Sequence, residues 1–358
     1  MSPEGLDLAA PQSASIAPGT SPRLISWLDW LRYGPFLAQM IVTRRCNLSC
    51  GYCTEYDKTS EPVPFDVLRE RLELLRDLRT WAVSLMGGEP TLHPDLLRIF
   101  STMRVLGFHR RMMTTNGLLL TKEIVDGLNN SGMTDMSLSI DGVKRNATTR
   151  KVLNVLRRKL DILAERAQFD VVVSAVIGTA PREEVLEVVE FAKSRGFTPR
   201  LLVLHNEHGQ MGLSSQELAV YAEVKQLFGH RVTEEAHGYR ERLIQNGEAP
   251  FRCRAGARYL YIDEFGMVRW CAQTRMAFGK RLSAYTLEDL RQHFYSEKAC
   301  SDKCCVGCVR TASALDQWRS QHSPETDLST GPRHKSPFHP SRCVQTNDNS
   351  SERVGAVS

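Results

Sequence analysis

The sequence predicts an α/β fold in which six βα units form a partial, TIM-like (β/α)6 barrel, followed by a small C-terminal domain. Short β-branched or apolar runs alternate with amphipathic helical patterns along most of the chain. Parallel strands need helical crossovers, so this alternation indicates a parallel sheet. Beyond residue 249 the pattern changes to aromatic-rich strands and clustered cysteines, which marks the second domain.

Each expected strand is followed by an expected helix. The strand candidates are residues 36–42, 82–86, 111–115, 135–140, 170–177 and 200–204. The helix candidates are residues 65–79, 94–106, 122–130, 148–168, 182–195 and 215–227, with apolar residues at helical spacing. Six units are fewer than the eight of a complete barrel, which favours an open barrel over its main alternative, a flat doubly wound sheet. In both folds the chemistry belongs in the loops at the C-terminal ends of the strands.

Four segments follow from these patterns. We expect a disordered leader at residues 1–22, the barrel at 23–249, the small domain at 250–320 and a disordered tail at 321–358, because both ends are polar and proline-rich. Within the small domain, Asp263-Glu264-Phe265-Gly266 suits a hairpin turn between two strands.

The composition is that of a globular protein. Hydrophobic residues make up 42% of the 358 and charged residues 24%, which disfavours a collagen, a wholly disordered chain and a coiled-coil rod. A net charge of +5 is too small to indicate nucleic-acid binding. The sequence contains no long apolar run and no signal-peptide pattern, so we expect a cytoplasmic protein without a membrane or nucleic-acid partner.

Ten cysteines in such a chain indicate metal binding rather than disulfides. Cys46, Cys50 and Cys53 follow the first strand as CxxxCxxC. Soft sulfur ligands suit an iron–sulfur cluster, and a [4Fe–4S] cube bound by three cysteines keeps one iron open to a small molecule. Zinc is the alternative, but a structural zinc site normally has a fourth ligand nearby, and the nearest histidine is the distant His93.

Small polar residues end the next three strands. They are Gly87, Gly88 and Glu89 after the second strand, Asn116 after the third, and Ser139 and Asp141 after the fourth. Each alone is also typical of a turn or a helix cap. Together they would surround one mouth with hydroxyl, amide and carboxylate groups suited to a ribose and an amino acid.

These motifs resemble the radical S-adenosylmethionine (radical SAM) superfamily, in which CxxxCxxC, GGEP, TTNG and SxD occur in this order, here within residues 36–205. The resemblance implies that the three cysteines of the first motif hold a [4Fe–4S] cluster whose open iron chelates S-adenosylmethionine. It places Gly87, Gly88 and Glu89 against the methionine ammonium, Asn116 in the cofactor-binding loops, Ser139 and Asp141 near the ribose, and Tyr52 and Ile177 against the adenine. It implies reductive cleavage to a 5′-deoxyadenosyl radical, which abstracts a hydrogen from a substrate.

The C-terminal cysteines resemble the auxiliary-cluster extensions of that superfamily, the twitch and SPASM types. Cys253 and Cys271 match the first half of those motifs, with Gly266 before the second cysteine. The resemblance implies one auxiliary [4Fe–4S] cluster, completed by Cys308 and either Cys304 or Cys305. Cys300 and Cys343 would be spare thiols, and a structural zinc hairpin is the alternative reading.

The sequence gives few candidates for the substrate site. His205 and His208 follow the sixth strand and could bind substrate or take a proton near neutral pH, although a polar surface loop explains them almost as well. We expect a small-molecule or a peptide or protein substrate and an electron donor such as a flavodoxin or ferredoxin. The alternative from another class is a non-catalytic iron–sulfur or zinc electron-transfer module.

Overall fold

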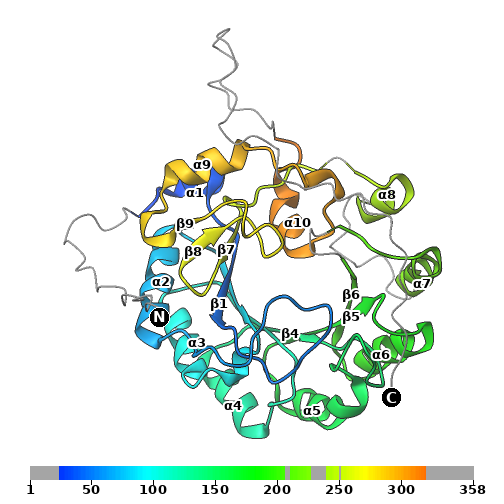
Figure 1. The fold of residues 1–358 in the computed structure, drawn as a ribbon. Helices are drawn as coiled ribbons and strands as arrows, with labels where there is room; N and C mark the ends of the chain where they lie inside the picture. Colours follow the sequence, from blue (N-terminus) through cyan, green and yellow to red (C-terminus); the bar gives the residue numbers. More distant parts are fainter. Residues whose placement is uncertain (1–23, 206–209, 227–238, 250, 320–358) are drawn as a thin grey trace, which may run out of the picture. The chain divides into compact units, whose positions relative to one another are not determined.

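The computed structural model describes residues 24–205, 210–226, 239–249 and 251–319 (Figure 1). It confirms the α/β class and the partial barrel, because six parallel strands form one sheet that does not close. The strands are β1 (Leu37–Thr43), β2 (Ala82–Gly87), β3 (Arg110–Thr115), β4 (Asp135–Ser139), β5 (Asp170–Ile177) and β6 (Thr198–Val203). Consecutive strands pair in parallel from β1 to β6, which is the strand order of a barrel and not of a doubly wound sheet.

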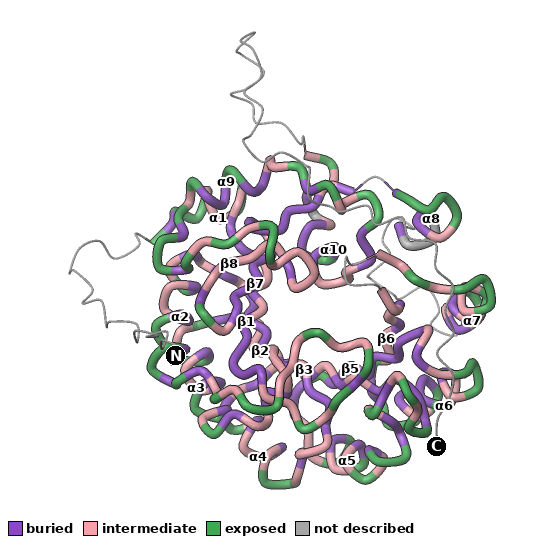
Figure 2. Tube along the Cα trace, viewed as in Figure 1, coloured by how far each residue is buried: buried purple, intermediate pink, exposed green. Residues whose placement is uncertain are grey.

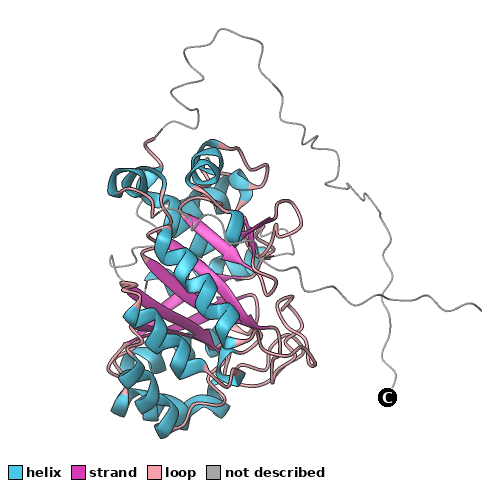
Figure 3. Ribbon diagram, turned by 90° about the vertical axis from the view of Figure 1, so that its left-hand side faces the viewer, coloured by secondary structure: helices cyan, strands magenta, loops and turns pink. Residues whose placement is uncertain are grey.

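Helices follow the strands and cover the outer face of the sheet (Figures 1 and 3). They are α2 (Phe65–Asp77), α3 (Leu96–Val105), α4 (Lys122–Ser131), α5 (Leu153–Arg166), α6 (Arg182–Ser194) and α7 (Ser215–Gln226). The predicted start of the 148–168 helix is wrong, because α5 begins at Leu153. The Asn146 side chain accepts hydrogen bonds from the backbone N–H groups of Thr148 (2.8 Å) and Thr149 (2.9 Å), which holds a turn there instead.

The strands alternate between two different environments. On β5, Val171, Val173 and Ile177 belong to the apolar core between the sheet and the helices, whereas Ser174 lies on the opposite face. Figure 2 shows buried residues along the strands and exposed ones mainly at the periphery. The face that bears Ser174 lines the barrel lumen, so lumen-facing residues have the same parity along each strand.

The C-terminal segment continues the same sheet. Strand β7 (Tyr259–Ile262) pairs in parallel with β1, and β8 (Met267–Arg269) and β9 (Lys280–Arg281) follow in antiparallel pairing. The predicted hairpin at Asp263–Gly266 is therefore confirmed. The boundary at residues 249 and 250 stays a prediction.

Four further α-helices lie in the described residues, and the sequence patterns predicted none of them: α1 (Trp27–Tyr33), α8 (Tyr239–Asn246), α9 (Leu287–Tyr295) and α10 (Gly307–Ser313). Among the described residues, no helix combines the length and apolar character needed to cross a bilayer.

Candidate active site

The CxxxCxxC loop begins directly beyond β1 and is anchored through its backbone. The N–H of Cys46 donates to the carbonyl of Asp57 at 3.0 Å. The ammonium of Lys58 donates to the carbonyl oxygens of Cys46 (2.9 Å) and Leu48 (2.6 Å). The sequence patterns did not predict this role for Lys58. A lysine in a charged run shows no sign of the backbone carbonyl groups that it will contact.

The three thiols of this loop form the predicted donor set. Cys50 is buried, while Cys46 and Cys53 are partly exposed. Burial raises the pKa of the Cys46 and Cys53 thiols, so both favour the protonated form until a metal displaces the proton. Within the described ranges, no three Cys, His, Asp or Glu side chains are arranged to hold a single metal ion. A [4Fe–4S] cluster binds each thiolate on a different iron, so its ligands need not converge on one point. Three cysteines on one loop therefore fit such a cluster.

Glu89 joins the end of β2 to the end of β3. Its side chain is fully buried, and Oε1 accepts from the Thr91 N–H (3.0 Å), the Thr91 hydroxyl (2.6 Å) and the Thr115 hydroxyl (2.6 Å). Oε2 accepts from the backbone N–H of Asn116 at 2.7 Å. These bonds satisfy a carboxylate that would be costly to bury alone.

Two glycines let the end of β2 approach the end of β1. A Cβ on Gly87, whose φ is +145°, would lie 2.0 Å from the carbonyl oxygen of Thr43, and one on Gly88 would lie 2.3 Å from that of Arg44. Only glycine fits such contacts. The close approach that the structure shows here is therefore to the neighbouring strand end.

Asn116 connects the third strand to the cysteine loop. Its amide nitrogen donates to Oδ1 of Asn47 at 2.7 Å and lies 3.9 Å from Sγ of Cys46. The structure thus brings Glu89, Asn116 and the cysteine loop together.

Tyr52 and Asp141 form the next contact across the mouth. The Tyr52 hydroxyl donates to Oδ2 of Asp141 at 2.6 Å, as does the Thr149 hydroxyl at 2.7 Å, and the Lys151 ammonium lies 3.3 Å from the same oxygen. Burial and the Asp141 carboxylate raise the pKa of Tyr52, so its hydroxyl keeps the proton that it donates. The Oδ1 atom of Asp141 is buried without a hydrogen-bond partner among the described residues, which leaves one acceptor for a ligand hydroxyl.

The other predicted residues lie in different environments. Ser139 ends β4 on the lumen face, partly exposed. The side chain of Ile177 belongs to the apolar core between the sheet and the helices. Its contact with adenine stays a prediction. His205 forms a β-bridge with Met211. His208 lies outside the described residues.

Arg200 on β6 brings a cation to the lumen face. Its Nη2 donates to the hydroxyls of Ser137 (2.6 Å) and Ser174 (3.0 Å), and its Nε donates to Ser174 at 3.1 Å. Ser137 and Ser139 share one face of β4, so Arg200 lies near the strand that carries the predicted ribose contact.

Four C-terminal thiols are near enough to act on one another electrostatically. Burial, with repulsion from Cys253 and Cys271, raises the pKa of Cys300 to about 11. Burial, with repulsion from Cys253, Cys271 and Cys300, raises the pKa of Cys304 well above its usual value. Cys300 and Cys304 flank the single turn η5 (Ser301–Lys303), and the Lys298 ammonium donates to the carbonyl of Cys253 at 3.2 Å.

The thiols of the predicted ligand set also lie near one another. Cys253, Cys271 and Cys305 belong to one apolar cluster, Cys308 packs against it, and repulsion from Cys271 contributes to a raised pKa of Cys308. The Cys308 thiol lies 3.7 Å from the Tyr259 hydroxyl, which donates to Oε1 of Gln39 on β1 at 2.5 Å. The ligand set stays a prediction. Cys343 lies outside the described residues.

A buried ion-pair network closes the base of the cysteine loop. Arg44 precedes the loop and Glu55 follows it, and the two pair at 2.6 Å. Arg44 also pairs with Glu264 of the C-terminal hairpin at 2.8 Å and donates to the Tyr261 hydroxyl at 3.2 Å, while Arg275 reaches Glu55 at 3.2 Å. Local sequence patterns carry no sign of this network, because it joins residues more than 200 positions apart.

Comparisons with known proteins agree with this arrangement. The model of the Radical SAM superfamily matches residues 40–219, half of the chain. A GTP 3′,8-cyclase from Aliarcobacter butzleri is 30% identical over 197 residues, which cover 49% of this chain and 59% of that protein. The chain therefore spans little more than half the length of this curated relative.

Two solved structures share the fold. Streptococcus suis SuiB bound to the precursor peptide SuiA has a TM-score of 0.59 at 17% identity, over 72% of this chain and 64% of that one. Native anSMEcpe with bound AdoMet and the Cp18Cys peptide has a TM-score of 0.54 at 15% identity, over 79% of this chain and 97% of that one.

Proposed function

This chain belongs to the radical SAM superfamily, and on that premise we propose that it cleaves S-adenosylmethionine reductively and removes a hydrogen atom from an organic substrate in the barrel lumen. The observation that carries the proposal is the convergence of three elements at the C-terminal ends of β1 to β4. These are the three-cysteine loop, the Glu89–Asn116 contact and the Tyr52–Asp141 pair.

Enzymes of this superfamily use a [4Fe–4S] cluster with S-adenosylmethionine. Cys46, Cys50 and Cys53 would hold this cluster, which when bound supplies the electron that breaks a C–S bond of the sulfonium. The protein supplies orientation and excludes water. The free Oδ1 of Asp141 accepts a ribose hydroxyl, and Oε2 of Glu89 has a second lone pair for the methionine ammonium.

The C-terminal thiols support an auxiliary [4Fe–4S] cluster. The electrostatic effects among Cys253, Cys271, Cys300 and Cys304 support these four as one ligand set, and the charge of Cys271 acts on Cys308 as well. The motif resemblance favours Cys308 in place of Cys300. The two sets differ in one cysteine, so single substitutions distinguish them.

The substrate class rests on the lumen and on the relatives. Arg200 offers a guanidinium oriented by two serine hydroxyls, which suits a carboxylate or phosphate of the substrate. SuiB and anSMEcpe, two structural relatives with TM-scores above 0.5, are both bound to peptides in these structures. A peptide is therefore the first class to screen and a phosphorylated small molecule the second, since a GTP 3′,8-cyclase is among the relatives. The reductant would be a flavodoxin or ferredoxin.

The test of the proposed function compares 5′-deoxyadenosine release with iron content in anaerobically reconstituted protein and a chemical reductant. The Asp141→Asn variant is expected to keep its iron and to lose most of its S-adenosylmethionine cleavage. The amide removes the negative charge that accepts the Tyr52 hydrogen bond and pairs with Lys151. Asp126→Asn, on the exposed face of α4, is the matched control and should retain both. Full cleavage in Asp141→Asn contradicts the assignment of this loop.

Iron counts test the auxiliary cluster. The wild type should bind about eight irons, and changing Cys46, Cys50 and Cys53 to Ala should leave about four. Cys300→Ala should then lower the remainder and Cys308→Ala should not. The reverse result supports the motif-based ligand set. Stoichiometric zinc without iron would favour the electron-transfer or structural alternatives.

A further inference from the structure

A pocket lies at the N-terminal ends of the strands, whereas the cysteine loop lies at their C-terminal ends. It has a volume of about 490 Å³, within the range of small-molecule sites. Its wall includes Thr80 and Trp81, which precede β2, and His109, which precedes β3. The cysteine loop follows the other end of β1, so a ligand here would not touch the radical site.

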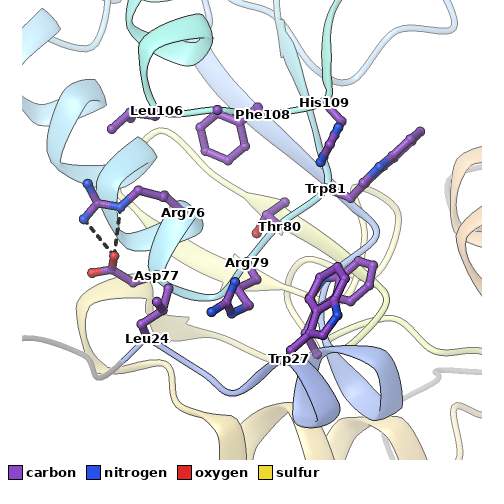
Figure 4. A pocket seen from close by; sticks show the side chains of 12 residues that line it. Leu24, Trp27, Arg76, Asp77, Arg79, Thr80, Trp81, Leu106, Phe108 and His109 are labelled. Atoms are coloured by element: carbon purple, nitrogen blue, oxygen red, sulfur yellow. Dashed lines mark hydrogen bonds and ion pairs between the residues drawn. The ribbon is translucent and has the colours of Figure 1, made fainter.

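Aromatic side chains form much of the pocket wall (Figure 4). Trp81 stacks on Phe36 at 4.6 Å between ring centroids and lies nearly parallel to the His109 ring at 6.1 Å. Trp27, on α1, stacks on Trp30 at 4.7 Å and is 65% exposed. Stacked partners hold these rings in place, so they present fixed apolar faces to a planar ligand.

Arg79 brings a positive charge to this aromatic pocket. Its Nε donates to the carbonyl of Ile25 at 2.6 Å, and its guanidinium lies 5.9 Å from the Trp27 ring centroid. In the described part of the chain, neither an ion pair nor any other hydrogen bond from its side chain is recorded. The neighbouring Arg76 differs, because Asp77 neutralises it at 2.7 Å.

The backbone of Arg79 is unusual as well. Its φ is +53°, and among the described residues no other non-glycine residue has a positive φ. It follows the end of α2, a position that glycine usually occupies because a Cβ is unfavourable there. Backbone strain of this kind is concentrated at functional sites. Here an arginine occupies the strained position, so a guanidinium lies at the pocket where a glycine would leave no side chain.

Thr80 supplies an independent sign of a ligand. It is 5% exposed, and its hydroxyl is buried without a hydrogen-bond partner among the described residues. Figure 4 shows its side chain in the middle of the ring formed by Arg79, Trp81 and Phe108. Buried polar atoms are nearly always paired, so an unpaired hydroxyl at this place calls for a partner from outside the chain.

From these features we infer that the pocket binds a small planar aromatic molecule that carries a carboxylate or phosphate. The ring packs against Trp27, Trp81 and Phe108, the anion pairs with the Arg79 guanidinium, and an oxygen of the ligand accepts the Thr80 hydroxyl. This binding is independent of S-adenosylmethionine and of the clusters.

The test uses 2-naphthoate as the probe and the neutral 2-naphthamide as its isostere, with affinities measured by calorimetry on the full chain. The naphthoate should bind saturably, and about tenfold more tightly than the amide, because only the acid forms a charge-assisted bond to Arg79. Equal affinity of the two probes, or no saturable binding of the acid, overturns the inference.

Variants separate binding from folding. Arg79→Gly removes the cation and suits the positive φ, so it should weaken naphthoate binding about tenfold while the melting temperature stays or rises. Thr80→Val should weaken binding several-fold without loss of stability, since it removes an unpaired buried hydroxyl. Arg76→Gln is the matched control and should bind as the wild type does.

Unchanged binding in Arg79→Gly rejects the proposed contact. Deletion of residues 1–23 tests another occupant. If the probe binds only after that deletion, the pocket holds the chain's own N-terminal segment and the inference is wrong. 5′-Deoxyadenosine release should be the same in Arg79→Gly as in the wild type, so this experiment is independent of the proposed function.

Discussion

Glu89 illustrates how a single buried carboxylate organises the site at the scale of the residue. Four hydrogen bonds from three residues end on its two oxygens, and they fix the loops after β2 and β3 relative to each other. A glutamate in this sequence position therefore orders the mouth of the barrel before any ligand is bound. Its structural role and its predicted role toward the methionine ammonium use different lone pairs.

Glu89→Gln should destabilise the fold. The glutamine amide has an NH2 group in place of one carboxylate oxygen. This NH2 group would face an N–H or O–H donor that the Glu89 oxygen accepts from. We expect the free energy of unfolding to fall by about 1–3 kcal/mol, the usual cost of an unsatisfied buried group. Urea denaturation measures this, with Glu70→Gln on the exposed side of α2 as the control. Equal stability of the two variants would mean that the Glu89 hydrogen bonds contribute little.

His293 on α9 predicts a pH dependence of stability. Burial, together with the charge of Lys298, lowers its pKa from 6.5 to about 4, and its Nδ1 accepts a hydrogen bond from the Trp270 indole. In the window between these values the unfolded chain binds a proton that the folded chain does not, so stability falls as the pH decreases from 6.5 toward 4.

The corresponding change is about 2 kcal/mol between pH 7 and pH 5 for this one group. His293→Gln keeps an acceptor for Trp270 but does not titrate. The difference in unfolding free energy between wild type and variant should therefore shift by that amount, in favour of the variant at pH 5. A constant difference across this range would show that His293 is not held neutral.

At the scale of the element, the cysteine loop depends on the ion pairs at its base. Arg44 is 8% exposed and lies between the carboxylates of Glu55 and Glu264. Because Glu264 belongs to the turn between β7 and β8, the loop geometry is coupled to the C-terminal hairpin. Removing one partner of a buried pair leaves an uncompensated charge, which costs about 3–5 kcal/mol.

Arg44→Gln should therefore release cluster iron to a chelator about tenfold faster than the wild type, since loss of one buried partner favours opening of the loop. The added substitution Glu264→Gln should restore part of the loss by removing the uncompensated carboxylate. Arg69→Gln, on exposed α2 surface, is the control. If the double variant releases iron as fast as Arg44→Gln alone, the proposed coupling to the hairpin is absent.

At the scale of the whole molecule, β7 covers the edge of the barrel sheet that β1 would otherwise expose. Leu37 to Met40 pair with Tyr259 to Ile262, and Ile41 packs in the apolar cluster that holds Tyr259 and Cys271. The described residues between 24 and 319 all belong to one compact unit. The cysteine-rich segment is thus part of what keeps β1 in register.

A chain that ends after residue 249 should lose cooperative thermal unfolding and aggregate, because it exposes an unpaired strand edge and the apolar face around Ile41. A chain that ends after residue 321 should melt like the full chain. Calorimetry and light scattering on both truncations decide this. A cooperatively folded 1–249 fragment would show that the barrel is stable without β7.

The sequence by itself determined the six βα units, the three-cysteine loop and the polar residues that end the strands, because these follow from local periodicity and spacing. Tertiary structure decided which face of β5 lines the lumen, because residues 170–177 carry valines on both faces and periodicity alone cannot tell the faces apart. Ile177 therefore lies on the helix side, which its motif could not show. It also decided that Arg44 meets Glu264. Such contacts depend on chain segments far apart in sequence, whose meeting is fixed only by the packing of the complete sheet.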